Sequence, residues 1–274
     1  MNDVTGLVLT FNEAPNIART LAKLTWLRSI VIVDSLSTDG TAEIVARFPN
    51  VRLVTRPFTT HADQWNYGLH DTAITSEWVL ALDADYVLTD ELIREIQSLD
   101  APAAVAGFRA AFDYCIDGVP LRGAAYPPVT VLFQRARARY RQDGHTQRVT
   151  MDGAVRDLSH RILHDDRKSL VHWLAAQARY MALEADKLRS VDRQSLGWAD
   201  RMRQWIVIAP PAMFAYCYLL RGGILDGKAG LFYALQRATS ELILSMFLVR
   251  RAMSNWPGAR TAPGGPAGVE AGRE

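Results

Sequence analysis

Two aspartates separated by one residue stand directly after an apolar run, in Leu80-Ala81-Leu82-Asp83-Ala84-Asp85. Neither carboxylate can enter a hydrophobic core without a large desolvation cost, so the run must deliver both to an edge. Magnesium and manganese favour oxygen ligands, and magnesium is often held by one or two carboxylates together with substrate phosphates. The triplet therefore predicts a divalent-metal site for a diphosphate substrate. Alone, it also fits a solvated turn after a strand.

Short apolar runs alternate with helical stretches through the first hundred residues. We expect strands over 4–11, 29–33, 51–55 and 78–82, and helices over 12–24, after 38–41 and over 63–70. Strands that alternate with helices of this length predict an α/β fold, with a mostly parallel sheet covered by helices on both faces.

Polar clusters follow three of the expected strands. They are Thr10-Phe11-Asn12-Glu13, Asp34-Ser35 and Asp83-Ala84-Asp85. In open α/β sheets, ligands bind outside the carboxyl ends of the strands. Asn12-Glu13 alone fits an ordinary helix start, and Asp34 alone fits a turn. The three clusters together predict one binding site at this edge.

The composition narrows the class of protein. The chain has 274 residues and a formal net charge of +2, so its charge gives no reason to expect a nucleic-acid partner. The two cysteines, Cys115 and Cys217, lie far apart in apolar surroundings, which favours a reducing compartment over a disulfide framework. The first residues show no cleavable signal peptide, so we expect no secretion by that route.

Several motifs resemble the family 2 inverting glycosyltransferases of the GT-A fold, especially small bacterial enzymes of lipopolysaccharide-core and surface-glycan assembly. The resemblance runs in order to about Trp256 and is strongest over the first hundred residues. Its motifs are Leu9-Thr-Phe-Asn-Glu13, Ile32-Val-Asp-Ser35, Ser37-Thr-Asp-Gly-Thr41, Gln64-Trp-Asn-Tyr-Gly-Leu69, Val79-Leu-Ala-Leu-Asp-Ala-Asp85, Tyr126-Pro127, Leu132-Phe-Gln-Arg135 and Gly223-Ile-Leu-Asp-Gly227 with Gly230-Leu231.

The resemblance implies a nucleotide-sugar donor, most simply a UDP-sugar, and a manganese or magnesium ion. It places Asp85 as the direct metal ligand, with Asp83 on the ribose or a metal-bound water. A later histidine often completes such a shell, and we expect His164 here, with His160 as second choice; His164 alone also fits a loop or core histidine. The nucleotide-binding residues implied are Thr10, Asn12, Glu13, Asp34, Asp39, Gln64, Asn66 and Asp83.

The general base is where the sequence departs from the family. Relatives commonly carry a His-Glu pair after the arginine-rich strand, whereas this chain has His145-Thr146. We expect His145 to take the proton from the acceptor hydroxyl, with Asp113 and Asp143 as alternatives. A histidine in a β-turn region is an equally ordinary explanation of His145.

The region after Asp166 is helical in character. We expect a catalytic domain over 1–166, a helical region over 167–256 and a disordered tail over 257–274. The apolar run 205–220 is shorter than the ~20 residues that cross a bilayer, contains two prolines and is flanked by Arg201, Arg203 and Arg221. Together with the amphipathic stretch 230–251, it fits an interfacial anchor. Core helices, a dimer interface or a re-entrant hairpin are the alternatives.

These expectations describe a bacterial enzyme at the cytoplasmic face of the inner membrane, acting on a glycan or lipid-linked acceptor. Two other functions remain open. A nucleotidyltransferase also uses paired acids on an α/β sheet, but the Gly/Arg/Lys-rich phosphate loop typical of that class is not found near residue 10. A catalytically impaired, membrane-associated scaffold would explain the threonine after His145.

Overall fold

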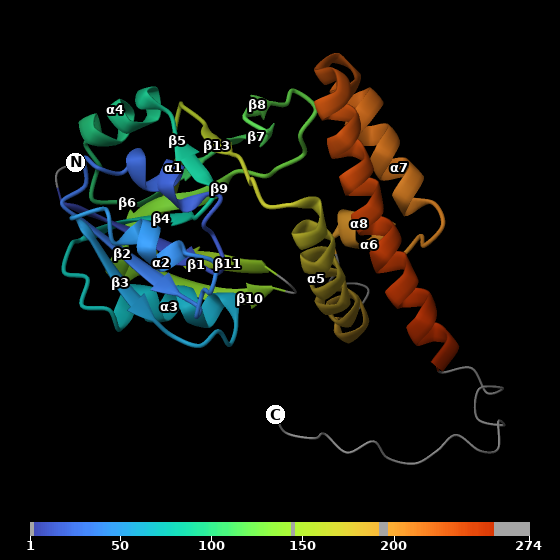
Figure 1. Cartoon of the computed structure of the whole chain (residues 1–274), viewed down its shortest axis with the longest axis horizontal. Helices are drawn as coiled ribbons and strands as arrows, with labels where there is room; N and C mark the ends of the chain where they lie inside the picture. The colour runs from blue at the N-terminus through green and yellow to red at the C-terminus, as the bar shows by residue number, and fades with distance from the viewer. Residues whose placement is uncertain (1–2, 144–145, 192–196, 255–274) are drawn as a thin grey trace, which may run out of the picture.

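A seven-stranded, mostly parallel sheet forms the centre of the molecule (Figure 1). The computed structural model describes residues 3–143, 146–191 and 197–254. The strand order is β12-β6-β9-β4-β1-β2-β3, with β9 antiparallel to both of its neighbours. The strands are β1 Val4–Thr10, β2 Ser29–Asp34, β3 Val51–Thr55, β4 Trp78–Asp83, β6 Val105–Ala110, β9 Val129–Gln134 and β12 Ala154–Asp157.

The register of the parallel strands brings the polar clusters to one edge. Thr10 of β1 pairs with Asp34 of β2, and Leu9 pairs with Asp83 of β4. Since β1, β2 and β4 run in the same direction, the loops that follow them meet at the same end of the sheet.

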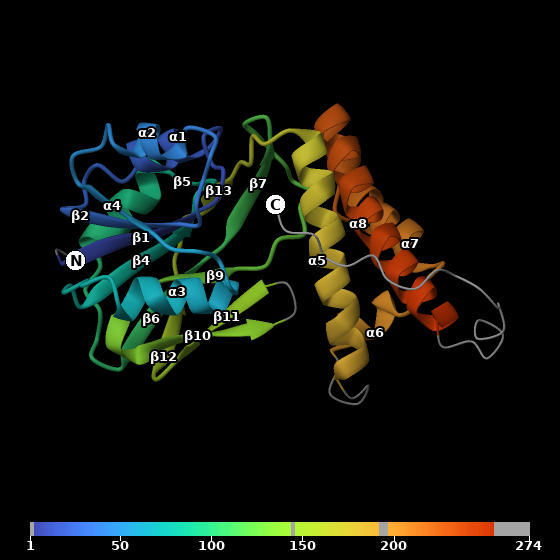
Figure 2. The ribbon, with the colours of Figure 1, turned by 60° about the horizontal axis from the view of Figure 1, so that its bottom comes forward.

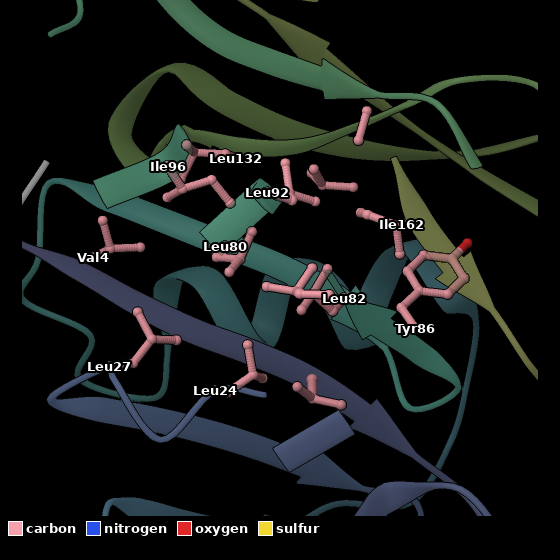
Figure 3. Packing of buried hydrophobic residues seen from close by; sticks show 14 of the residues in the cluster. Val4, Leu24, Leu27, Leu80, Leu82, Tyr86, Leu92, Ile96, Leu132 and Ile162 are labelled. Carbon is pink, nitrogen blue, oxygen red and sulfur yellow. The ribbon is translucent and has the colours of Figure 1, made fainter. Parts of the chain in front are cut away.

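Both faces of the sheet are covered, as the alternation of strands and helices predicts. Leu80 and Leu82 pack in one core cluster with helices α1, α2 and α4, part of which is drawn in Figure 3. Val79 and Ala81 point the other way, into a second cluster with helix α3 and a β10–β11 hairpin. The elements are α1 Ile17–Ala22, α2 Thr41–Val45, α3 His61–His70, α4 Asp90–Ser98, β10 Ala138–Asp143 and β11 Thr146–Met151.

A second sheet of four short strands lies beside the end of β4. Its order is β5-β13-β7-β8, and its strands come from three separate parts of the chain, because β7 and β8 form one hairpin. In this sheet His164 pairs with Tyr86 on one side and Tyr114 on the other. The strands are β5 Tyr86–Leu88, β7 Phe112–Ile116, β8 Val119–Pro120 and β13 Ile162–His164.

In the described part of the chain after β13, helices α5 to α8 stand beyond the end of the sheet toward which the β10–β11 hairpin extends (Figure 2). The Ser169 hydroxyl caps the first of them, accepting from the amide of His172. Helix α8 packs against α5 and α7. The helices are α5 Leu170–Ser190, α6 Trp198–Arg203, α7 Ala209–Ala215 and α8 Gly227–Ser254, with a π turn at Tyr216–Leu220 and a 3-10 turn at Gly223–Asp226.

The Gly223 and Gly230 pair holds the turn before α8 against the helix itself. A Cβ atom at Gly230 would lie 1.9 Å from the carbonyl oxygen of Gly223, so only glycine permits this approach. Within the described residues, no helix combines the length and the apolar character that crossing a membrane requires. The expected tail, 257–274, lies outside the described residues.

Two local expectations need correction. The helix expected over 12–24 begins only at Ile17, because Asn12 has a positive φ of 54° and residues 13–16 form a turn. Helix α4 is an addition to the expected elements: Thr89 caps it, Asp90 and Glu91 stand in its first turn, and Leu92 and Ile96 form its buried face.

Candidate active site

The loops after β1 and β2 are held together by the Asp34 carboxylate. Thr10 donates to its Oδ1 atom at 2.7 Å, the Ser37 hydroxyl donates to the same atom at 2.6 Å, and the Ser37 amide donates to Oδ2 at 2.8 Å. Thr10 and Asp34 are buried. The carboxylate therefore fixes the shape of the rim above both strands.

Asn12 and Asp39 add a second set of contacts between the same two loops. The Asn12 side-chain oxygen accepts from the amide of Thr38, and Asp39 accepts from the amide of Ala14 and from the Thr41 hydroxyl. Asn12 has a left-handed backbone, which asparagine tolerates better than most residues. Both side chains thus hold the loops at this edge in one arrangement.

Gln64 and Asn66 lie on α3 but serve different neighbours. Gln64 is buried, donates to the Ser35 hydroxyl at 2.9 Å and accepts from Arg56 at 2.9 Å, so it supports the loop after β2. The Asn66 amide group instead pairs with both backbone groups of Tyr140, at 2.9 Å each. Asn66 therefore positions β10, and its amide is engaged there.

Asp85 and His164 come together where the two sheets meet. The Nε2 atom of His164 lies 3.1 Å from Oδ2 of Asp85, and both side chains are about 15% exposed (14% and 15%). Asp83 ends β4 on the same turn, two residues before Asp85. The structure thus brings Asp85 into contact with His164 and leaves Asp83 at the end of the neighbouring strand, two residues before Asp85.

An aromatic wall surrounds His164. Its ring lies 4.7 Å from Tyr126, 4.8 Å from Tyr114 and 5.1 Å from Tyr86, between ring centroids. The Nδ1 atom is buried and finds no hydrogen-bond partner among the described residues. The wall fixes the orientation of the ring and leaves Nε2 directed at Asp85.

Lys168 and Glu13 form an ion pair that sequence reasoning misses. Lys168 Nζ lies 2.5 Å from Oε1 of Glu13, and the two side chains are 15% and 13% exposed. Lys168 follows β13 at the point where the chain crosses from the sheets to α5. A lysine four residues after a candidate ligand histidine is the only signal in the sequence that points to it.

The carboxylates of this edge are crowded. Burial and the negative charge of Asp85 raise the pKa of Asp83 to about 6. Burial raises the pKa of Glu13 to about 7, although Lys168 opposes the shift. Burial also favours the neutral form of Asp85, but the His164 imidazole more than offsets it and holds the pKa of Asp85 below its ordinary value.

The donor set suits a divalent cation of the magnesium or manganese class. Burial raises the pKa values of Glu13 and Asp83, the negative charge of Asp85 adds to both shifts, and the charges of Lys168 and, for Asp83, His164 oppose them. In the part of the chain that the structure describes, no group of three or more Asp, Glu, His or Cys side chains is gathered closely enough to hold a metal by itself. An ion held by Asp85 and His164 would need substrate oxygens as well.

The two aspartates that are candidate general bases, Asp113 and Asp143, lie on different strands and are each held in an ion pair. Asp113 is bound to Arg161 at 2.6 Å, and its neighbours Phe112 and Tyr114 face His164, so alternation along β7 turns Asp113 away. Asp143 ends β10 and binds Lys187 at 2.9 Å.

Two further histidines are candidates: His145 as the general base and His160 as the second choice of metal ligand. His145 lies outside the described residues. His160 binds Glu95 of α4 at 2.8 Å, so it is engaged away from Asp85.

Comparison with known proteins finds glycosyltransferases. The chain is similar to the "Lipopolysaccharide core biosynthesis glycosyltransferase LpsC" of Rhizobium meliloti (strain 1021), with 26% identity over 255 residues that cover 84% of this chain and 88% of that protein. An uncharacterized glycosyltransferase of Rickettsia felis is 28% identical over 102 residues, which cover 37% of this chain and 35% of that protein.

Two solved structures are also similar. S. aureus TarS 1–349 in complex with UDP-GlcNAc has a TM-score of 0.41 at 14% identity, covering 93% of both chains. Glucosyl-3-phosphoglycerate synthase from Mycobacterium tuberculosis has a TM-score of 0.45 at 12% identity, covering 69% of this chain and 79% of that one. The family model of glycosyl transferase family 2 matches residues 7–154, from β1 to the start of β12. With more than half of its length matched, this chain belongs to glycosyl transferase family 2, a family of inverting glycosyltransferases.

Proposed function

We propose that this enzyme moves a sugar from a nucleoside-diphosphate sugar, with UDP as the first nucleotide to test, to a hydroxyl of a glycan or lipid-linked acceptor, and that it needs manganese or magnesium. The contact between Asp85 and His164, beside Asp83 at the carboxyl end of the sheet, carries this proposal. The proposal is supported by two side chains that can bind a metal and that lie at the end of the sheet where ligands of α/β sheets bind.

The donor pocket is formed by the cross-linked loops after β1 and β2. Thr10, Asp34 and Asp39 hold those loops in place, and Asn12 and Glu13 follow β1 at their centre. Gln64 supports the pocket from α3. We assign the nucleoside to this rim because its polar groups come from two adjacent strand ends.

On one side of the sugar, the reaction needs a group that stabilises the negative charge of the leaving diphosphate. On the other side, it needs a general base for the acceptor hydroxyl. Asp85 and His164 would hold a divalent ion, whose positive charge would offset the negative charge that develops on the departing diphosphate. We propose that the base is either Asp143, which ends β10, or His145, because Asp113 is turned away from His164. Transfer rates of Asp143→Asn and His145→Ala, set against Asp113→Asn, would identify it; loss only in Asp113→Asn would refute the assignment.

The acceptor side is proposed to face a membrane surface. The region from α6 to α8 exposes large apolar side chains, including Val207 at 84%, between α6 and α7, and Leu220 at 80%, in the π turn after α7. Exposed arginine and lysine side chains lie among them, as expected for a surface that contacts anionic lipid. The exposed groups are Trp198, Trp205, Val207, Leu219, Leu220, Ile224 and Leu225, with Arg201, Arg221, Lys228 and Arg250.

The experiment that tests the function is donor turnover. The purified enzyme would be incubated with UDP-sugars and manganese, and release of UDP followed with and without a chelator. Metal-dependent release that Asp85→Ala abolishes supports the proposal. Failure with UDP-, GDP-, CDP- and dTDP-sugars, in the presence of detergent extracts of bacterial envelope as acceptor, would favour the catalytically impaired scaffold instead.

A further inference from the structure

The segment 165–168 begins beside Asp85, where the amide of Asp165 donates to the Asp85 carbonyl, and it contacts helix α1 and the loop after β1. It leaves β13 directly after His164 and enters α5 after Ser169. At its end, Lys168 Nζ meets Glu13 Oε1 at 2.5 Å, with 15% of the lysine side chain exposed. The lysine thus connects the segment after the candidate metal ligand to the loop after β1.

Lys168 stands among the negative charges of the site. Glu13, Asp85 and Asp166 all act on its ammonium group and favour its charged form, against burial. An ammonium group has three N–H donors. In the described part of the chain, the only hydrogen bond of Lys168 Nζ that we identify is the one to Glu13, which leaves two donors for a ligand.

Other residues already anchor the segment. Arg19 of α1 binds Asp165 at 2.5 Å, and Asn16 binds Asp166 at 2.8 Å and accepts from the amide of Arg167 at 2.8 Å. The position of the segment therefore does not depend on the lysine. A largely buried cation that contributes only one of several contacts holding this segment, and that lies beside a site for an anionic ligand, is available to contact that ligand.

We propose that Lys168 contacts the diphosphate of the donor and stabilises it as the leaving group, as a second positive charge beside the metal. The inference rests on the proposed function, since it needs a nucleoside diphosphate at this edge. Ammonium–phosphate contacts are charge-assisted hydrogen bonds and among the stronger polar contacts in proteins. Lys168 would then act on the phosphates and leave recognition of the nucleoside to the loops after β1 and β2.

The test compares three ligands that differ only in phosphate number. Calorimetric titrations with UDP, UMP and uridine in manganese give the affinity added by each phosphate. In Lys168→Ala and Lys168→Gln we expect the combined advantage of UDP over uridine to fall about 10- to 100-fold, with uridine affinity unchanged. Lys168→Arg, which keeps the charge, should restore part of it.

Arg19→Ala is the matched control, because it removes an anchor of the same segment and leaves the ammonium in place. We expect this variant to keep the wild-type ratio of UDP to uridine affinity even where its melting temperature falls. Equal ratios in wild type, Lys168→Ala and Lys168→Gln would overturn the inference. Failure of the wild-type enzyme to bind UDP at all would instead overturn the proposed function.

A double variant separates a phosphate contact from simple neutralisation of Glu13. If Lys168 only offsets Glu13, then Glu13→Gln combined with Lys168→Ala should recover wild-type UDP affinity, which would contradict the inference. If the ammonium contacts the diphosphate, the double variant should bind UDP at least as weakly as Lys168→Ala.

Discussion

His164 Nε2 lies 3.1 Å from Asp85 Oδ2, although the two residues are 79 positions apart in the chain. The contact depends on the small sheet, in which β13 runs between β5 and β7 and so returns the chain to the turn after β4. One residue supplies an oxygen and the other a nitrogen, and both suit a divalent metal.

We expect His164→Ala to weaken manganese affinity in the presence of UDP by about tenfold or more, because the ion loses one of two close protein ligands. Removal of the ring also takes away one of the two positive charges that act on Asp85, the other being Lys168. Titration of manganese into the UDP complex measures the effect. His160→Ala is the control, since His160 is bound to Glu95 on α4. An equal loss of manganese affinity in both variants would show that His164 is not a metal ligand.

The raised pKa values of Asp83 and Glu13 predict a pH-dependent stability of the metal-free protein. Their values of about 6 and about 7 lie above the ordinary 3.8 and 4.5, so the folded state binds more protons than the unfolded state between about pH 4 and 7. The free energy of unfolding therefore falls as pH rises through this window. The Asp83 shift corresponds to roughly 2–3 kcal/mol.

Urea denaturation in a chelator at pH 4.5, 6 and 7.5 checks this. Asp83→Asn mimics the protonated form of Asp83, so in this variant the free energy of unfolding should fall less as pH rises. Asp90→Asn, at an exposed pair with Lys23, should leave the slope above pH 5 as in the wild type. A stability that rises steadily across the window would show that these carboxylates are not the crowded groups of the site.

A buried ion network holds the C-terminal helices together. Arg203 of α6 binds Glu184 of α5 at 3.0 Å and Glu241 of α8 at 3.1 Å, and both glutamates are buried. We expect Arg203→Ala to cost about 3–5 kcal/mol of unfolding free energy, because two buried carboxylates lose their shared cation. Chemical denaturation followed by far-UV circular dichroism measures it. The exposed Arg250→Ala should change the value by less than about 0.5 kcal/mol.

The exposed apolar surface of α6 to α8 predicts binding to anionic vesicles. Leu220→Glu and Leu225→Glu, each at a strongly exposed leucine, should weaken co-sedimentation with vesicles of mixed phosphatidylglycerol and phosphatidylethanolamine by about tenfold each. Val119→Glu, on β8, is the control at an exposed apolar residue outside this surface.

Two results would count against a lipid surface. Vesicle binding equal to that of the wild type in both leucine variants would show that this surface does not touch the bilayer. Conversion of a dimer to a monomer in those variants, seen by light scattering, would identify the surface as an interface between two copies of the chain.

Local patterns are sufficient to predict much of the sheet. Val51–Thr55 forms the third strand with the expected bounds, and β1, β2 and β4 differ from the expected ranges by one residue at their ends. These strands are continuous apolar runs followed by polar residues, and both features are local. The amino-acid sequence alone is therefore enough to assign the polar clusters at their ends to one edge of the sheet.

Other features of the site depend on contacts that no local pattern contains. The pairing of Glu13 with Lys168 joins residues 155 positions apart, through a crossing segment that carries no turn motif. Asn66 is grouped with Gln64 in the sequence because they are neighbours on one helix, yet its amide pairs with the backbone of Tyr140. Which face of a helix meets which strand is decided by packing, and packing is set by the whole chain.

The central claim, a metal-dependent nucleoside-diphosphate site at Asp85, is tested most directly by calorimetric titration of UDP with manganese, with a chelator, and with manganese into Asp85→Ala. We predict binding in the first titration and a loss of at least about tenfold in the other two. Equal UDP affinity in all three, or no binding of UDP, GDP, CDP or dTDP by the wild-type enzyme, would contradict the account.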